Sequence, residues 1–351
     1  MKKNVHGGDI YTHKGVIDFS ANINPLGIPE NVIKAAENGI RDSVHYPDVS
    51  YYALRTAIAE QENLLSNEIL CGNGAADVIF SLIRAINPKK ALILAPTFAE
   101  YETALKTVCC EIRYYDLKEK EEFKAQKNIL EYITEELDIV FLCNPNNPTG
   151  QLTDKGLLKQ ITEQCKKTGT YVVIDECFND FLENGEAYTM KEELENNSYL
   201  VLLKAFTKLY AMPGLRLGYC MSSNCALLDK IKESTQPWNI SIPAEQAGIA
   251  ALKEKQYVQK TKSLIKKEKE YLQQEMKAMG YKLYGSKANY IFFRGTDTLY
   301  EDCLNENLLI RDCSNYRGLE KGYYRIAVKS HEDNVKMIEC LRKYMPKDIQ
   351  D

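Results

Sequence analysis

Two residues eight positions apart, Lys208 and Arg216, have the side chains and spacing best suited to chemistry. They stand in the segment KAFTKLYAMPGLRLGY (204–219), directly after an apolar run. A lysine in such a turn can be desolvated, and the lower pKa makes its amine better at forming an imine. The arginine suits a phosphate, because its rigid fork donates two charge-assisted hydrogen bonds. By itself a lysine in a turn is usually a solvated charge, and the continuation PGLRLGY (213–219) is what favours imine chemistry at Lys208.

A glycine-rich turn at residues 72–77 (GNGAAD) offers another contact to a phosphate. It lies between an apolar run and a predicted helix, so free backbone N–H groups and the helix dipole can meet an anion there. Most glycine-rich sequences are simply tight turns. By itself this turn is therefore weak evidence for a phosphate site.

Two polar residues follow apolar runs directly. Asn147 stands in NPNNPTG (144–150), just after the run 139–142, and Asp175 ends the run 171–174. Prolines and a glycine fix the first loop, so that it presents Asn147. A carboxylate at position 175 is either a helix N-cap or the partner of a protonated ring nitrogen, and the residues alone leave both open. Functional residues of a parallel sheet should cluster at such positions, where strands end and loops begin.

The elements that must position these residues alternate along the chain. Strands are predicted at residues 91–94, 139–142, 171–174 and 199–203, with helices at 77–86 and 155–167 among them. This alternation is typical of an α/β fold, with a mostly parallel sheet between two layers of helices. After residue 235 the pattern changes to a lysine-rich helix and further strands, at 256–279, 289–293, 308–311 and 323–328.

That change predicts three parts of the chain. Residues 1–30 form an N-terminal arm that joins the small domain and the active site. Residues 31–235 form the large domain, which binds the cofactor. Residues 236–351 form a smaller domain of α+β type, because helix and strands no longer alternate as they do in the large domain.

Composition restricts the partners. The formal net charge of −4 leaves no basic excess to hold nucleic acid. No run approaches the ~20 apolar residues of a membrane span, and no apolar signal-peptide region follows the first lysines. The eleven cysteines lack metal-ligand spacing, which indicates reduced thiols and no metal site. We expect a cytoplasmic protein that acts on a small molecule.

In order and spacing, these motifs resemble the fold-type I enzymes of the class I and II aminotransferase family, which use pyridoxal 5′-phosphate (PLP). The resemblance implies that Lys208 is catalytic and holds PLP as a Schiff base. It also implies that Asn147 bonds the phenolic oxygen, that Asp175 pairs with the pyridine nitrogen and that Phe98 stacks on the ring. The implied cofactor-binding residues are Gly74, Ala75, Phe98, Asn147, Asp175, Thr207, Lys208 and Arg216, with Tyr46 reaching the cofactor phosphate of the other subunit in a homodimer.

Within this family the chain is most similar to the threonine-phosphate decarboxylases, which themselves resemble histidinol-phosphate aminotransferases. The similarity lies in HGG (6–8), DFSANINPLG (18–27), PTFAEY (96–101), KLYAMPG (208–214) and IRDCSNYRGL (310–319). It implies decarboxylation of L-threonine O-3-phosphate to (R)-1-amino-2-propanol phosphate, for the cobamide nucleotide loop. The implied substrate-binding residues are His6, Asn24, Asn147, Arg311 and Arg325.

Two positions depart from the pattern of the aminotransferases. Ala205 replaces the usual serine three residues before the lysine, which removes one hydroxyl from the cofactor phosphate. The loss of one neutral hydrogen bond could cost ~1 kcal/mol of binding. Phe178 replaces a tyrosine and removes a bond to the phenolic oxygen, a change that agrees with the decarboxylases.

Three alternatives remain at this point. A histidinol-phosphate-type aminotransferase would use the same lysine and cofactor, and serine phosphate differs from threonine phosphate by one methyl group. A non-enzymatic regulator of the same fold would carry an attached DNA-binding segment, for which we expect no room in 351 residues.

Overall fold

The computed structural model describes residues 6–345, in which seven strands form the main sheet in the order β2-β8-β7-β6-β5-β3-β4. These strands are β2 (Ile69–Gly72), β3 (Lys90–Ala95), β4 (Glu111–Asp116), β5 (Ile139–Cys143), β6 (Tyr171–Asp175), β7 (Leu200–Ala205) and β8 (Gly218–Met221). Only β8 runs against its neighbours β2 and β7 within this sheet. The mostly parallel α/β sheet expected from the sequence is therefore confirmed.

Both faces of this sheet are buried, and its central strands β5, β6 and β7 are apolar except for Asp175 at the end of β6 and Lys204 near the end of β7. On β5, Val140 and Leu142 pack into one cluster, while Ile139 and Phe141 pack into the other. The second cluster lies beneath α3 (Ala75–Ile86), α4 (Ala99–Lys106) and α7 (Cys225–Glu233). The first cluster includes α2 (Tyr52–Glu62) and α5 (Lys155–Thr168). Strands buried on both faces are those that read as continuous hydrophobic runs.

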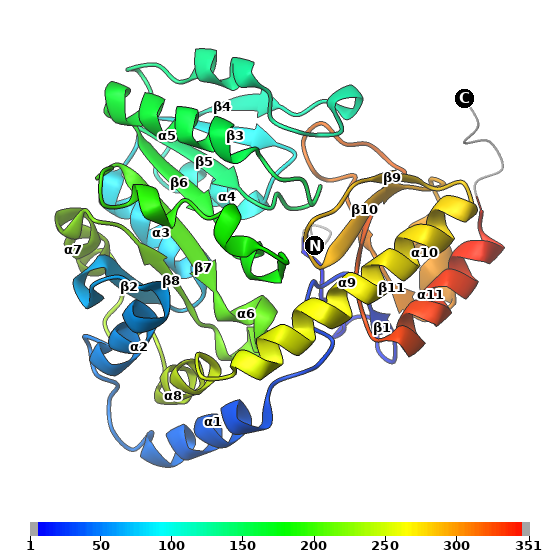
Figure 1. Cartoon of the computed structure of the whole chain (residues 1–351), viewed down its shortest axis with the longest axis horizontal. Coiled ribbons are helices and arrows are strands. Elements are labelled where there is room, and N and C mark those ends of the chain that lie inside the picture. The colour runs from blue at the N-terminus through cyan, green and yellow to red at the C-terminus, as the bar shows by residue number, and fades with distance from the viewer. Residues whose placement is uncertain (1–5, 346–351) are drawn as a thin grey trace.

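A smaller antiparallel sheet follows, in the order β12-β13-β10-β9. Its strands are β9 (Lys282–Tyr284), β10 (Tyr290–Arg294), β12 (Arg311–Asp312) and β13 (Tyr323–Ala327). The associated helices are α9 (Lys255–Ala278), α10 (Leu299–Asn305) and α11 (His331–Lys343). Figure 1 shows α9, in yellow, running from the large body to this sheet. The domain boundary at residue 235 stays a prediction, and α8 (Ile242–Ala251) after it packs on α1 (Glu30–Asp42) and α2.

The strand predicted at 308–311 is in fact two short strands with different partners. β11 (Leu308–Leu309) pairs in parallel with β1 (Ile17–Asp18), whereas β12 pairs with β13. The chain changes sheets at Ile310, which is buried. Backbone hydrogen bonds thus hold the N-terminal segment on the small body. Because β12 follows β11 after one residue, this pairing also places the N-terminal segment near β12.

One segment of the large body, residues 119–123, packs against the small sheet. The Phe123 ring packs edge-on against Tyr284, Phe292 and Tyr323, with centroid distances of 5.1, 5.5 and 5.9 Å. The Glu119 carboxylate accepts hydrogen bonds from Lys282 (2.8 Å), from Tyr323 (2.9 Å) and from Tyr284. These contacts link the large body to the small sheet. Across residues 6–345, no helix is both long and apolar enough to cross a membrane.

Candidate active site

A cavity of about 200 Å³ lies where β5, β6 and β7 end and the small sheet begins. The loops after these three strands reach it together, because parallel strands end at the same edge of a sheet. Its lining residues are His6, Gly7, Ser20, Ala21, Asn22, Ala75, Ala76, Phe98, Cys143, Asn147, Asp175, Cys177, Phe178, Ala205, Thr207, Lys208, Arg216, Arg311, Tyr316 and Arg325.

The lining carries a strong excess of positive charge. Its described residues include Lys208, Arg216, Arg311 and Arg325, against the single carboxylate of Asp175, and His6 adds a further basic group. Low-dielectric walls lined by one sign of charge concentrate the opposite charge. The cavity therefore suits a ligand, or a pair of ligands, with several negative charges.

Lys208 stands in the four-residue helix α6 (Phe206–Leu209), which begins directly after β7. Burial lowers the pKa of its amine to about 8, and the nearby charges of Arg325 and Arg216 act in the same direction. A neutral amine is therefore accessible close to physiological pH. This is the protonation state that attacks a carbonyl carbon.

Gly74 and Arg216 come together at the start of α3. Gly74 has a φ of 86°, and a methyl group added to it would collide with the Arg216 guanidinium. Arg216 follows the short helix Pro213–Leu215 and donates from Nη1 to the Pro213 carbonyl (3.2 Å). The N-terminus of α3, at Ala75, and a guanidinium thus share one corner of the cavity. Both features attract a phosphate.

Asp175 and Asn147 lie at the ends of neighbouring strands. Asp175 is 5% exposed and accepts hydrogen bonds from the Tyr101 hydroxyl (2.6 Å) and the Cys177 N–H (2.9 Å). The Asn147 side-chain oxygen accepts from Arg325. The amide nitrogen of Asn147 has no acceptor among residues 6–345, so it remains a donor for a ligand in the cavity.

Two buried arginines face each other on the small sheet. Arg311 of β12 and Arg325 of β13 are directly opposed across the antiparallel pair. Arg325 donates from Nη2 to the Ser20 carbonyl (2.6 Å), while its buried Nε has no partner in the described part of the chain. Arg311 donates from Nη2 to Asn315 (2.8 Å) and lies 5.2 Å from the centre of the Tyr316 ring. Like charges directly opposed are unfavourable, so an anion between them is a natural ligand.

The HGG sequence places His6 at the cavity. A methyl group at Gly7 would collide with the Ser20 carbonyl, and the Gly8 N–H donates to the Ser20 hydroxyl (2.7 Å). This close approach leaves His6 on the rim, with Nε2 3.1 Å from a carboxylate oxygen of Glu100.

Comparisons with known proteins agree with this geometry. Residues 14–341 match the family model described as "Aminotransferase class I and II". The chain belongs to this family. It is 35% identical to the threonine-phosphate decarboxylase of Salmonella typhimurium, over 97% of this chain and 96% of that protein.

Two solved structures also resemble the chain. The histidinol-phosphate aminotransferase from Clostridium acetobutylicum is 32% identical with a TM-score of 0.87, and the L-threonine-O-3-phosphate decarboxylase from Porphyromonas gingivalis is 25% identical with a TM-score of 0.80. Each similarity covers 93% of this chain and 98% of the other. The fold is therefore the PLP fold type I of this aminotransferase family.

The cofactor of this aminotransferase family is PLP, and the cavity fits it. The α3 N-terminus and Arg216 would hold its phosphate, the Lys208 amine its aldehyde carbon and the buried Asp175 its ring nitrogen. The Phe98 ring lines the same cavity, as does the buried Thr207. Ala205 also lines it and offers no hydroxyl. These individual roles stay predictions.

Asn24 and Tyr46 do not line the cavity of their own chain, and Tyr46 was expected only at that of a partner subunit. The Asn24 amide donates to the Leu209 carbonyl and the Thr261 hydroxyl, both at 2.7 Å, and it is not among the residues that line the cavity. Substrate contact by Asn24 therefore finds no support here; the residue instead braces the helix that carries Lys208. Tyr46 is 79% exposed, outside the cavity, with its ring 4.8 Å from that of Trp238.

Tyr101 and Tyr316 were not predicted from the sequence. Tyr316 lines the cavity beside Arg311, and Tyr101 lies behind its wall, bonded to Asp175. The string PTFAEY (96–101) contained a signal for Tyr101, because it lies three positions after Phe98 and residues three apart on a helix share a face. Tyr316 has no such signal, since its position depends on how residues 311–319 fold over β12.

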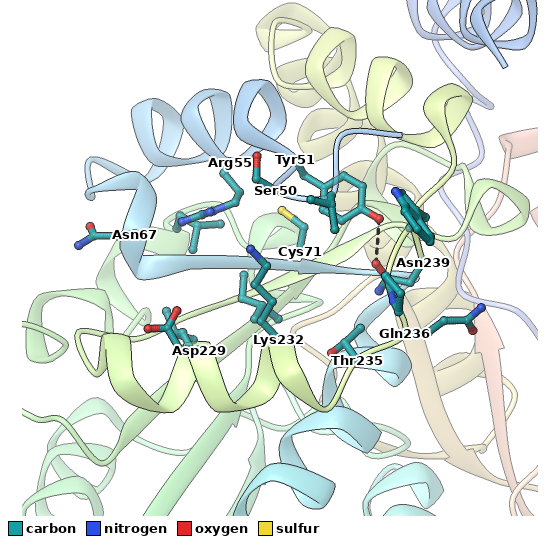
Figure 2. A pocket seen from close by; sticks show the side chains of 16 residues that line it. Ser50, Tyr51, Arg55, Asn67, Cys71, Asp229, Lys232, Thr235, Gln236 and Asn239 are labelled. Carbon is teal, nitrogen blue, oxygen red and sulfur yellow. Dashed lines mark hydrogen bonds between the residues drawn. The ribbon is translucent and has the colours of Figure 1, made fainter. Parts of the chain in front are cut away.

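A separate hollow of about 150 Å³ lies between α2, β2 and α7 (Figure 2). The Tyr51 hydroxyl donates to the Asn239 side chain (3.0 Å) at one side of it, as the dashed line shows. Asn239 in turn donates to Asp77 (2.6 Å), which also accepts from the Asn73 N–H (2.9 Å). This chain of bonds ties the segment that follows Tyr46 to the glycine-rich turn of the cavity.

Proposed function

We propose that this chain catalyses the PLP-dependent decarboxylation of L-threonine O-3-phosphate to (R)-1-amino-2-propanol phosphate, a step that serves cobamide synthesis. The observation that carries the proposal is the opposed pair Arg311 and Arg325, which lines the cavity of Lys208 together with His6. A phosphorylated amino acid has the negative charge that this arrangement attracts. The 35% identity to a threonine-phosphate decarboxylase over nearly the whole chain supports the same reaction.

The residues divide into two groups. Lys208 would hold the cofactor, Arg216 and the α3 N-terminus its phosphate, Asp175 its ring nitrogen and Asn147 its phenolic oxygen. Arg311, Arg325 and His6 would bind the substrate. Lys208 lies close enough to Arg325 and Arg216, one residue from each group, for their charges to lower its pKa.

When bound, PLP supplies an electron sink for the pair of electrons released from a bond at the substrate Cα. Which bond breaks depends on how the substrate is held. By holding the substrate phosphate, Arg311 and Arg325 would leave the α-carboxylate without the arginine clamp that transamination requires. Lys208 Nζ can carry a proton and release it near neutral pH, so we assign it the protonation of Cα. Phe178 lines the cavity but has no hydroxyl, so it cannot donate a hydrogen bond to the phenolic oxygen of PLP.

The active form would be a homodimer. Tyr46 cannot serve the cavity of its own chain, since it is exposed and turned against Trp238. Other apolar side chains are exposed on the same stretch, namely Ile40, Val44, Val49 and Tyr52. A surface patch of this kind marks a protein interface. In a dimer, Tyr46 would reach the cofactor phosphate of the partner.

The deciding experiment offers threonine phosphate and serine phosphate separately to the purified holoenzyme and identifies the amine and the CO2 released. We expect aminopropanol phosphate from threonine phosphate. The His6→Ala variant should turn over this substrate more slowly than the wild type. A keto acid as product, or unchanged turnover by His6→Ala, would overturn the decarboxylase assignment.

A second candidate is a histidinol-phosphate-type aminotransferase. It is favoured by the TM-score of 0.87 to such an enzyme, above the 0.80 to the decarboxylase structure. The same assay separates the two, because transamination consumes a keto acid and releases no CO2.

A further inference from the structure

Tyr101, on α4, contacts two of the proposed cofactor-binding residues, Asp175 and Phe98, on their side away from the cavity. Its side chain is fully buried and its hydroxyl donates to Asp175 Oδ2 at 2.6 Å. Its ring stacks on Phe141 at a centroid distance of 4.9 Å and meets Phe98 edge-on at 5.6 Å. One side chain thus touches both the carboxylate expected at the ring nitrogen and the aromatic ring expected to stack on the cofactor.

The two oxygens of Asp175 are each held by one donor. Tyr101 holds Oδ2, and the Cys177 N–H holds Oδ1 at 2.9 Å. The carboxylate therefore cannot rotate without breaking one of these bonds. Burial, followed by the charge of Asp175, raises the pKa of Tyr101 well above its ordinary value. The tyrosine consequently stays a hydrogen-bond donor, which is the form that favours an ionised carboxylate opposite it.

We propose that Tyr101 is a positioning residue, which fixes the Asp175 carboxylate and the Phe98 ring around the pyridine ring of the cofactor. The role rests on the proposed function only in that Asp175 and Phe98 contact PLP; it holds whichever amino acid is the substrate. Tyr101 does not itself line the cavity and so touches neither ligand directly.

The physical consequence concerns the electron sink. An ionised, correctly aimed carboxylate keeps the pyridine nitrogen protonated, and the protonated ring accepts electrons best. Loss of the tyrosine hydroxyl removes a hydrogen bond to a charged group and frees the carboxylate to rotate. The chemical step should slow, whereas binding by Arg311 and Arg325 should not change.

The test is Tyr101→Phe in the holoenzyme, which keeps the ring and deletes the hydroxyl. We expect kcat to fall about tenfold, with KM within about twofold, from the usual scale of a charge-assisted hydrogen bond. Without any substrate, the bound cofactor should show a shifted absorption band with an altered pH midpoint, and PLP should dissociate more readily on dialysis.

A matched control is Tyr281→Phe, which deletes another buried hydroxyl, bonded to the Leu341 carbonyl at 2.9 Å in the small body. It should lower thermal stability without a change in the spectrum or in PLP affinity. A double variant tests the route: in the Asp175→Asn background, Tyr101→Phe should add little, because interacting positions are not additive.

Three outcomes would overturn the proposal. The first is a folded Tyr101→Phe protein with the kcat, spectrum and PLP affinity of the wild type. The second is a loss confined to thermal stability, as in Tyr281→Phe. The third is an effect that adds fully to that of Asp175→Asn. Since the spectrum and the PLP affinity need no substrate, these results stand apart from any failure of threonine phosphate to react.

Discussion

Arg311 and Arg325 occupy directly opposed positions on the antiparallel strands β12 and β13, and both side chains are more than nine-tenths buried. Both side chains also line the cavity, so an anion bound there can meet two buried guanidinium groups at once. The pair can therefore contribute to affinity for the substrate phosphate.

Replacing Arg311 by Gln should raise KM for threonine phosphate at least about tenfold, the scale of one lost charge-assisted hydrogen bond. Steady-state kinetics measures the change. Arg294→Gln is the control, because this arginine lies on β10 of the same sheet, outside the cavity, with its side chain 40% exposed. An equal rise in KM in both variants would contradict a phosphate contact by Arg311.

Replacing Lys208 by Met should stabilise the cofactor-free protein. The folded pKa of about 8 lies below the ordinary 10.5, so the buried charge destabilises the fold fully below pH 8. This destabilisation amounts to about 3 kcal/mol and disappears as the pH rises from 8 to 10.5. Urea unfolding of both apo-proteins at pH 7 and pH 10 measures the difference, which should shrink at the higher pH. A Lys208→Met protein less stable than the wild type at pH 7 would refute it.

Replacing Glu119 by Gln should weaken the link between the two bodies. Burial alone would raise the pKa of this carboxyl, but the hydrogen bonds from Lys282, Tyr284 and Tyr323 outweigh it and lower the pKa to about 2. The carboxylate therefore stabilises the fold above pH 4.5, and the contribution is lost as the pH falls through 2. We expect a loss of about 2 kcal/mol at pH 7.

Chemical unfolding at pH 7 and pH 3 tests this prediction. The gap between wild type and Glu119→Gln should be smaller at pH 3. A gap that is equal at both values would show that the ionised carboxylate is not the source of the stability. Glu121→Gln, in the same short helix, serves as the control.

Trp238 offers a direct report on the proposed dimer, since it is the single tryptophan of the chain and packs on Tyr46. Dilution of the holoenzyme should shift its fluorescence to longer wavelength and release PLP over the same concentration range. Tyr46→Phe should lower PLP affinity, whereas Tyr11→Phe, at a side chain 85% exposed, should not. A fully active monomer in sedimentation would contradict the shared site.

Much of the cavity could be predicted because its residues stand at the ends of local elements. Lys208 follows β7, Asp175 ends β6 and Asn147 follows β5, and the sequence predicts each of these strands from its apolar run. A parallel strand buried on both faces reads as a nearly continuous apolar run, so the polar residues at its end mark where the strand stops in the sequence. Parallel pairing then brings the three ends to one edge.

Other features depend on which distant segment each residue meets. The chain changes sheets at Ile310, because β11 pairs with β1 whereas β12 pairs with β13. The Asn24 amide donates to Thr261 of α9, which lies beside the N-terminal segment. The Tyr101 hydroxyl donates to Asp175, 74 positions away in the sequence. Residue types and spacing therefore determined the α/β sheet and the chain positions of Lys208 and Arg216, which both line the cavity, because these follow from local backbone rules. Only the tertiary structure decided which polar side chains share a hydrogen bond, because that choice is made by packing between segments far apart in the chain.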